Sequence, residues 1–375
     1  ILFALAQHDL KRLLAYSSVE NIGLIGAGIG LGLLGISYHL PLLSALGFAG
    51  ALVHVLNHSL FKGLLFMGAG SVAHASGTRE MDCLGGLLKK MPWTGSLFLF
   101  GAVAICGLPP LNGFISELLL AGGSLVAITA EPAQTAIAGL IALACIGLIG
   151  GLAAATFTKA FGIVFLGEPR QSLKAAPHEI GTLMKVPMTI LAIGCAGIAL
   201  GAAWLLRIVT PIASQLGNFD PQIIATELRL PAAVLGIVSA FGLALATAFV
   251  VIAFVRRSLL SGRTVSAADT WGCGYARPGT RMQYTASSFS QPITTLFQWL
   301  LGIRYQKQQP EDIFPARASF ASETPDLCHG NVYHPAFIRA NWGLSKLRWL
   351  QQGKVQLYVL YIAVTLIVLL AWKFR

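Results

Sequence analysis

Long apolar stretches alternate with short polar connections along most of this 375-residue chain. A helix that crosses a bilayer needs about 20 apolar residues, because each residue adds about 1.5 Å and the hydrocarbon core is about 30 Å thick. The stretches that meet this length have the approximate bounds 13–36, 42–75, 92–122, 134–166, 186–206, 231–255 and 355–372. The pattern therefore predicts an all-α fold, a polytopic bundle of about seven transmembrane helices.

The composition supports a membrane protein. Hydrophobic residues make up 55% of the chain and charged residues only 11%, whereas soluble domains carry about 25% charged residues. The net charge of +11 would suggest a nucleic-acid partner in a soluble protein. If the helices alternate in direction, however, most Lys and Arg side chains fall on one side, and the exceptions are Arg207, Arg229, Lys373 and Arg375. This asymmetry marks the richer side as cytoplasmic and requires no nucleic acid.

The residues between the last two predicted spans differ in composition. Segment 256–354 has soluble-type composition and cannot span a membrane, so we place it on the cytoplasmic side. Apolar residues recur at helical spacing within 284–302, which predicts a lateral amphipathic helix, and 336–352 is a second candidate. We divide the chain into an antiporter-like module, additional transmembrane helices, this segment and a C-terminal anchor, at 1–167, 168–255, 256–354 and 355–375.

Three titratable residues lie inside the second predicted span. His54, His58 and Lys62 follow one another at intervals of four residues, so they lie close to one face of the helix. A charge at the centre of a bilayer costs several kcal/mol, and such residues usually mark a functional site. The spacing predicts a row of proton carriers. The alternative is that the histidines are hydrogen-bonded core residues and that Lys62 is a structural cation.

The third predicted span is interrupted. Gly107, Pro109, Pro110 and Gly113 cannot continue a regular helix, which predicts a discontinuous helix at membrane depth. Discontinuous helices often line ion pathways. Glu117, about one turn past the break, is therefore a candidate acidic end of a proton path, or alternatively a carboxylate at the membrane interface that pairs with a basic residue.

Other polar features are less specific. Glu20 lies two turns into the first span, either at the mouth of a cavity or within the network. Lys159 lies near the end of its span and could reach the interface, which favours a structural role. The glycines of 30–35 match a dinucleotide-binding spacing, but no strand precedes them, so we interpret them as a helix-packing surface. The cysteines show no CxxC spacing, and we expect no metal site.

Several motifs together resemble a known family. Residues 8–18 read HDLKRLLAYSS, residues 61–66 read FKGLLF, and the two histidines and the broken helix follow in the order and spacing of the antiporter-like subunits of respiratory complex I and the Mrp antiporters. Within that superfamily, the tail motif TWGCGY at 270–275 is similar to the branch of hydrogenase-4 component B and formate hydrogenlyase subunit 3. The resemblance to the shared module covers about 1–167.

This resemblance implies a proton-translocating membrane subunit. On the matching positions, Lys62 would be the central carrier, His54 and His58 its connectors, and Glu117 the carrier toward the far side. Some members of the family have lysine at the position of Glu117 and others have glutamate. The resemblance therefore does not imply that a lysine releases the proton at this position. The family's upstream half has no match here, so we expect this chain to correspond to a C-terminal part. The possible accessory residues are Asp9, Lys11, Glu20 and Lys159.

The functional expectation is a non-redox subunit without a cofactor, in the inner membrane of the cell. Its partners would be other membrane subunits of a hydrogenase or complex-I-like assembly and the lipid bilayer. The transported ions would be protons, with sodium ions as the alternative. One alternative is a sodium/proton antiporter subunit that works without redox partners. Another is a structural anchor that does not pump.

Overall fold

The computed structural model describes residues 1–170, 176–264, 280–307, 320–350 and 353–374. These residues form two compact units, Ile1–Gln298 and Trp299–Arg375. The tail motif at 270–275 lies outside the described residues.

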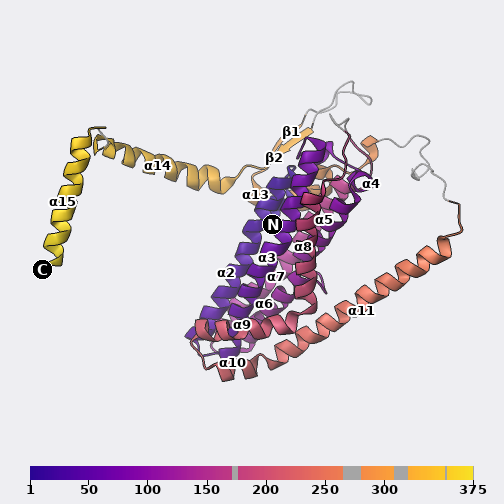
Figure 1. The fold of residues 1–375 in the computed structure, drawn as a ribbon, viewed down its shortest axis with the longest axis horizontal. Coiled ribbons are helices and arrows are strands. Elements are labelled where there is room, and N and C mark those ends of the chain that lie inside the picture. The colour runs from indigo at the N-terminus through magenta and orange to yellow at the C-terminus, as the bar shows by residue number, and fades with distance from the viewer. Residues whose placement is uncertain (171–175, 265–279, 308–319, 351–352, 375) are drawn as a thin grey trace. The chain divides into compact units, whose positions relative to one another are not determined.

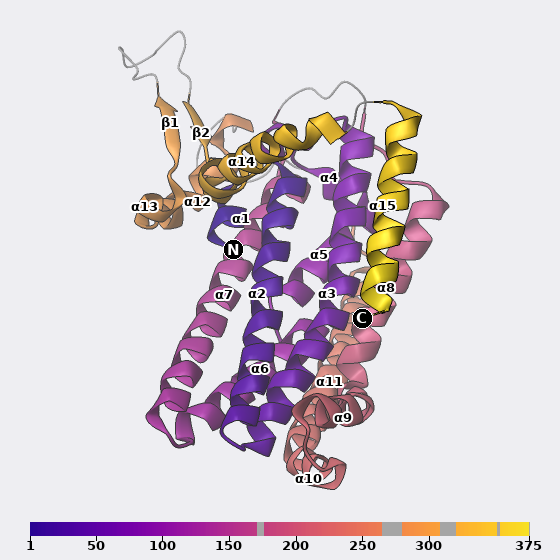
Figure 2. The same ribbon diagram turned by 90° about the vertical axis from the view of Figure 1, so that its left-hand side faces the viewer.

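Seven helices of the described chain are long and apolar enough to cross a membrane, as the sequence predicted. They are α2 (Leu10–Ser37), α3 (Pro41–Ser76), α6 (Asn112–Thr129), α7 (Ala133–Phe165), α8 (Thr182–Leu200), α11 (Arg229–Leu260) and α15 (Val355–Lys373). The chain is a multi-pass helical membrane protein. In the first unit, α2, α3, α6 and α7 run side by side (Figures 1 and 2).

Helix α3 is the centre of the first unit and contacts α2, α6 and α8, together with α5 (Pro92–Ile105) and α9 (Ala202–Gly217). It begins with Pro41, whose missing N–H costs nothing in the first turn, and ends before Gly77, which adopts the left-handed conformation with φ 73°. Since most of α3 is buried against other helices, polar side chains on it must find partners within the protein.

Small residues let α2 approach α3 closely. A side chain at Gly32 would collide with the ring of Phe48, and one at Gly35 would collide with the backbone of Ser44. The predicted packing surface is therefore confirmed at these two glycines, whereas Gly30 faces open space. This contact fixes which residues of α2 face the polar side chains of α3.

The third predicted span is broken, as expected. Helix α5 (Pro92–Ile105) ends near Gly107, which has φ 61°, and α6 resumes at Asn112. Pro109 and Pro110 lie in the connection, outside any helix. The chain therefore carries non-helical backbone between two apolar helices.

The end of the bundle that carries most basic residues is tied together by polar contacts. Short helices α1 (Leu2–Leu5) and α4 (Leu87–Lys90) and a 3₁₀ turn, Met81–Cys83, lie there with α12 (Ala286–Leu296). The Asp82 carboxylate accepts hydrogen bonds from the His8 ring, at 3.1 Å, and from the Ala286 amide, at 2.7 Å. Burial by itself raises the pKa of Asp82. The hydrogen bonds from His8 and Ala286 outweigh this effect, so the pKa lies below its usual value.

A helix is present where the lateral helix was expected over 284–302, but it is shorter. Helix α12 ends at Leu296 and is followed by the separate turn α13 (Gln298–Leu301). Thr285 and Ser288 cap α12 reciprocally, which fixes its start. The buried face of α12 consists of Ala286, Ser290 and Thr294. Because these side chains are small, α12 packs closely on α7, with Phe289 and Ile293 partly buried and Leu296 exposed.

At the opposite end of the bundle the chain turns across it. The span expected over 186–206 ends at Leu200, and α9 (Ala202–Gly217) and α10 (Pro221–Glu227) follow before α11. The apolar run continues past residue 200, so hydropathy alone could not locate this turn at Gly201.

The second unit contains β1 (Arg304–Lys307) and β2 (Phe320–Glu323), paired antiparallel with Arg304 opposite Glu323. It continues through a π-helical turn (His329–Tyr333), α14 (His334–Ser345), a 3₁₀ segment (Lys346–Leu350) and α15. Helix α14 overlaps the second amphipathic segment expected over 336–352. A last 3₁₀ turn, Thr280–Met282, belongs to the first unit.

Candidate functional site

His54 joins three helices at the middle of the bundle. It lies on α3 with only 1% of its surface exposed. Its Nδ1 lies 2.9 Å from the Ser116 hydroxyl on α6, and its Nε2 lies 3.1 Å from Oδ1 of Asn21 on α2. Both ring nitrogens are therefore partnered, which fixes the plane of the imidazole.

Lys62 lies two turns further along α3 and is buried, with 5% of its surface exposed. Its ammonium donates to the carbonyl of Leu14, at 2.8 Å, and to the hydroxyl of Ser17, both on α2. The ring of Phe157 on α7 lies 6.0 Å away. The carbonyl of Ser17 accepts from the amide of Asn21 at 2.7 Å, so Lys62 and His54 are linked through α2.

A second set of polar contacts connects His54 to the helix break. The amide of Asn57 donates to the hydroxyl of Ser116, at 3.0 Å, and to the carbonyl of Asn112, at 2.6 Å. The amide of Asn112 donates back to Asn57 at 3.1 Å. Asn57 thus anchors the first turn of α6, and the hydrogen-bonded chain runs from Lys62 to the start of α6.

Glu117 follows Ser116 on α6 and faces the break. A side chain at Gly107 would collide with its carboxyl group, so the carboxyl packs against the bare backbone of that glycine. Gly113 similarly packs on the carbonyl of Ala104 at the end of α5. Glu117 forms no ion pair with the described residues, which offers no support for pairing with a basic side chain.

Glu20 is buried on α2, with Oε2 3.3 Å from the amide nitrogen of Asn21, so it lies beside the hydrogen-bonded chain. His58 lies outside it. Its ring packs edge-on against Phe61, with centroids 5.8 Å apart, and its Nε2 is buried without a partner among the described residues. The direct contacts from His54 to Lys62 therefore pass through α2 and not through His58.

Two accessory candidates lie at the basic end of the bundle. Asp9 caps α2 by accepting from the amide of Arg12, at 2.9 Å, and pairs with the Nε of Arg79 at 3.1 Å. Lys11 is half-buried on the first turn of α2. Neither residue contacts the chain between Lys62 and α6.

Lys159 makes its contacts inside the protein, and its side chain does not extend to the surface. Its side chain is fully buried, and its ammonium donates to the carbonyls of Leu5, at 2.6 Å, and Gln7, at 2.8 Å. The carbonyl of Leu5 ends α1 and that of Gln7 lies two residues beyond, where no further turn of the helix supplies a partner. The lysine therefore ties α1 to α7, away from the chain of hydrogen bonds described above.

The arrangement brings together a cation, an imidazole and hydroxyl and amide groups in a buried strip across α2, α3 and α6. Hydroxyl groups can donate and accept at the same time, and both lysine and histidine can gain or lose a proton. Among the described residues, no three His, Cys, Asp or Glu side chains gather as metal ligands. Ser17, Asn21, Asn112 and Ser116 were not among the sequence candidates. The signal was the recurrence of Ser17, Glu20 and Asn21 on one face of an apolar helix.

Comparison with known proteins confirms the resemblance seen in the sequence. Residues 1–146 match the family described as NADH:quinone oxidoreductase/Mrp antiporter, transmembrane. The chain is 36% identical to hydrogenase-4 component B of Escherichia coli K12, over 99% of this chain and 56% of that protein. It is also 36% identical to formate hydrogenlyase subunit 3 of the same organism, over 81% of this chain and 48% of that protein. The chain thus spans about half the length of these curated relatives.

The fold also has a solved counterpart. A chain of the membrane-bound sulfane sulfur reductase, an archaeal respiratory membrane complex, superposes with a TM-score of 0.58 at 22% identity. The match covers 99% of this chain and 53% of that one. At this identity the match bears on the fold alone.

Proposed function

We propose that this chain is part of a proton-translocating membrane subunit of a hydrogenase-4, formate hydrogenlyase or complex-I-like redox assembly. The observation that carries the proposal is the strip of polar residues in contact, from buried Lys62, through the hydroxyl and the carbonyl of Ser17, Asn21 and His54, to Ser116, which precedes Glu117 in α6. A structural core gains nothing from a buried lysine at one end of a polar strip and a partly buried carboxyl near the other, because withdrawing each charge from water costs several kcal/mol.

The residues of the strip have different roles. Lys62 and His54 bind and release protons, and Glu117 does so at the helix break. The Ser17 hydroxyl accepts from Lys62 and donates to the carbonyl of Leu14, while the Ser116 hydroxyl contacts the ring of His54, so each hydroxyl offers a proton carrier a polar partner. Asn21 and Asn57 are positioning residues, since an amide holds its neighbours in place without changing charge.

The direction of transport must come from elsewhere in the assembly. A relay alone lets protons pass either way, so partner subunits have to change the energies of Lys62 and Glu117 during each cycle. We assign no redox centre to the chain. We place the basic end of the bundle, together with segment 256–354, on the cytoplasmic side, because Lys and Arg are enriched in cytoplasmic loops.

A second candidate is a cation/proton antiporter subunit. It is favoured by the description of the matched family, which names the Mrp antiporter beside NADH:quinone oxidoreductase. Proton exchange that depends on sodium and needs no electron donor would support this candidate. Proton uptake that depends on electron transfer and is indifferent to sodium would support the redox assembly.

The test uses the full-length subunit in its assembly, reconstituted in vesicles. Lys62→Ala should abolish coupled proton transport, because no neighbouring side chain can replace the ammonium at Ser17. Lys90→Ala, which removes an exposed lysine, is the control and should transport at the normal rate. Unchanged transport in Lys62→Ala would contradict the proposal and favour a structural anchor.

A further inference from the structure

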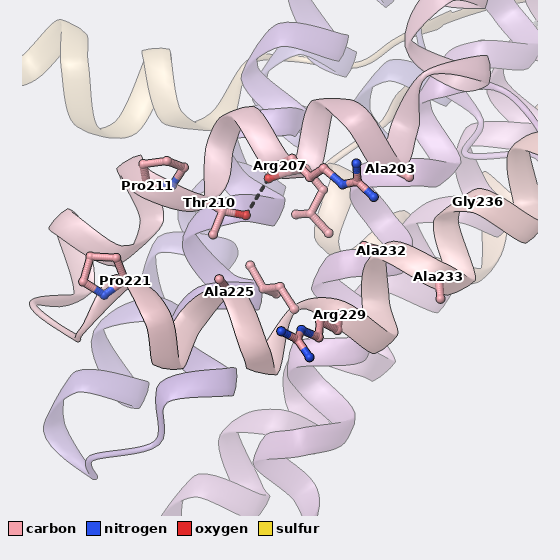
Figure 3. Close-up of a pocket in the computed structure, with 12 residues that line it drawn as sticks. Ala203, Arg207, Thr210, Pro211, Pro221, Ala225, Arg229, Ala232, Ala233 and Gly236 are labelled. Carbon is pink, nitrogen blue, oxygen red and sulfur yellow. Dashed lines mark hydrogen bonds between the residues drawn. The ribbon is translucent and has the colours of Figure 1, made fainter.

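A pocket of about 680 Å³ opens between α9, α10 and α11, at the end of the bundle away from most basic residues. Its walls are mainly apolar and include Ala203, Leu206 and Ala232. Figure 3 shows Arg207, from α9, and Arg229, from the start of α11, on opposite sides of this pocket. Its size is in the range of pockets that hold small organic molecules.

The two arginines have no anionic partner within the described part of the chain. Neither forms an ion pair or a side-chain hydrogen bond there. The nearest acidic residue in sequence, Glu227, lines a different pocket, and the hydroxyl of Thr210 is occupied by the carbonyl of Leu206 at 2.7 Å. Both side chains are exposed, and an anion placed between two guanidinium groups is attracted by both.

Their position in the membrane adds a second argument. Arg207 and Arg229 are two of the few basic residues on the side that the positive-inside rule leaves poor in Lys and Arg. Arg229 begins α11, a candidate membrane span, and Arg207 lies on α9, which packs against α11. An anion that binds Arg207 and Arg229 must therefore be stable at the boundary between water and the hydrocarbon layer.

The pocket continues along the helices as an apolar groove. A neighbouring hollow of about 470 Å³ shares Ala203, Arg207 and Gly236 with it and extends to Leu243 on α11. Since α11 rises about 1.5 Å per residue, the step from Arg229 to Leu243 is about 21 Å, comparable to much of an acyl chain. The aromatic ring of Trp204, 68% exposed, lines this hollow, and tryptophan is enriched at membrane interfaces.

We propose that this groove binds one anionic phospholipid, with its phosphate between Arg207 and Arg229 and an acyl chain along α11 toward Leu243. Arginine suits the role because its planar guanidinium can donate two parallel hydrogen bonds to a phosphate group. The apolar continuation distinguishes a lipid from a free anion, which would leave the hollow beside Trp204 and Leu243 empty. This inference does not depend on the proposed proton relay.

The test measures lipid binding by the full-length subunit, delipidated in detergent, using native mass spectrometry. The probes are dioleoylphosphatidylglycerol and dioleoylphosphatidylcholine, which share acyl chains and differ in headgroup charge. We expect the first to bind about tenfold more tightly. The double variant Arg207→Gln/Arg229→Gln should lose this preference, whereas Arg256→Gln/Arg257→Gln, which removes two exposed arginines near the other end of α11, should keep it.

A second variant tests the groove without altering charge. Nothing lies within 4 Å of a side-chain carbon built at Gly236, so Gly236→Leu fills the shared hollow without a collision at that atom. It should weaken phosphatidylglycerol binding while leaving the thermal unfolding midpoint unchanged.

Four outcomes would overturn the proposal. They are equal binding of the two lipids, retention of phosphatidylglycerol by the arginine double variant, normal binding by Gly236→Leu, and displacement of the lipid by millimolar inorganic phosphate. The last would indicate a site for a free anion. If the double variant instead detaches a partner subunit without changing lipid binding, an acidic side chain of that partner occupies the pocket.

Discussion

At the scale of single residues, the account depends on how α2 meets α3. Lys62 donates to both the backbone and a side chain of α2, and the side-chain acceptor is Ser17. Ser18, the next residue, bonds only to the carbonyl of Leu14 in its own helix, at 3.2 Å. The two serines are therefore a matched pair that differs in contact with the lysine.

Replacing Ser17 by alanine should slow proton transport about tenfold. A hydrogen bond to a charged group contributes about 1.5–3 kcal/mol, and 1.4 kcal/mol corresponds to a factor of ten. The measurement is the rate of acidification or alkalinisation in vesicles. Ser18→Ala should transport normally, and equal losses in the two variants would show that the serine contact is not specific.

The two histidines should differ as well. His54→Ala removes a ring that bonds to both Asn21 and Ser116, so transport should fall about tenfold or more. His58→Ala removes a ring whose Nε2 has no partner among the described residues, so the loss should be less than about threefold. The measurement is the transport rate of each variant, normalised to the amount of assembled protein. Equal losses in the two variants would contradict the different roles assigned to the two histidines.

Only part of this site could be predicted from the sequence. Lys62, His54 and Glu117 could be identified because titratable side chains are conspicuous in apolar spans. Ser17 and Asn21 share a face of their helix with Glu20, but this signal is weak, because serine and asparagine also occur in membrane helices as self-bonded residues. Their role depends on the rotation of α2 against α3, which is set by glycine contacts far along both helices and not by local spacing.

At the scale of elements, the break between α5 and α6 is held open by small residues. Gly107 combines φ 61° with direct contact to the carboxyl of Glu117. Gly107→Ala should lower stability by about 1–3 kcal/mol, since alanine is strained at positive φ. It should also displace the carboxyl and slow transport.

Gly150→Ala on α7 is the control, because nothing lies within 4 Å of a side-chain carbon at that position. It should leave stability equal or raise it by up to about 1 kcal/mol, since alanine favours the helix. Thermal unfolding of the purified protein measures both changes. An unaltered midpoint in Gly107→Ala would mean that the break tolerates a side chain.

The attachment of α12 should depend on pH through Asp82. Because the folded-state pKa of Asp82 is lowered, its contribution is full above the unfolded pKa of about 3.9 and is lost as pH falls through the folded pKa. Hydrogen exchange at the first amides of α12, including Ala286, should therefore rise below about pH 4 after correction for intrinsic rates. Asp82→Asn should show little of this pH dependence, and an identical pH profile would assign it elsewhere.

At the same scale, hydropathy predicted the number of spans, while most helix ends required the structure. The span expected over 186–206 ends early because the chain turns at Gly201, although the residues beyond remain apolar. The helix expected over 284–302 is interrupted at Phe297 because the last turn of α12 closes there. Apolar periodicity reports which residues avoid water, and it does not report where the backbone changes direction.

At the scale of the whole molecule, the described residues include a buried strip of polar contacts, and the chain spans about half the length of its curated relatives. A path for protons must open to water on both sides of the membrane. The described strip begins at Lys62 and ends beside Glu117, so under the proposed function it would supply an internal section of such a path. We expect the full assembly to supply the connection to the other side and the energy input.

The most direct test asks whether Lys62 and Glu117 serve one path. Coupled proton flux should be measured in vesicles for the full-length subunit in its assembly, for Lys62→Ala, for Glu117→Gln and for the double variant. If both residues carry the same proton, the double variant will be about as slow as the slower single variant, because a blocked path cannot be blocked again. Normal flux in either single variant, or losses that multiply in the double variant, would contradict the account.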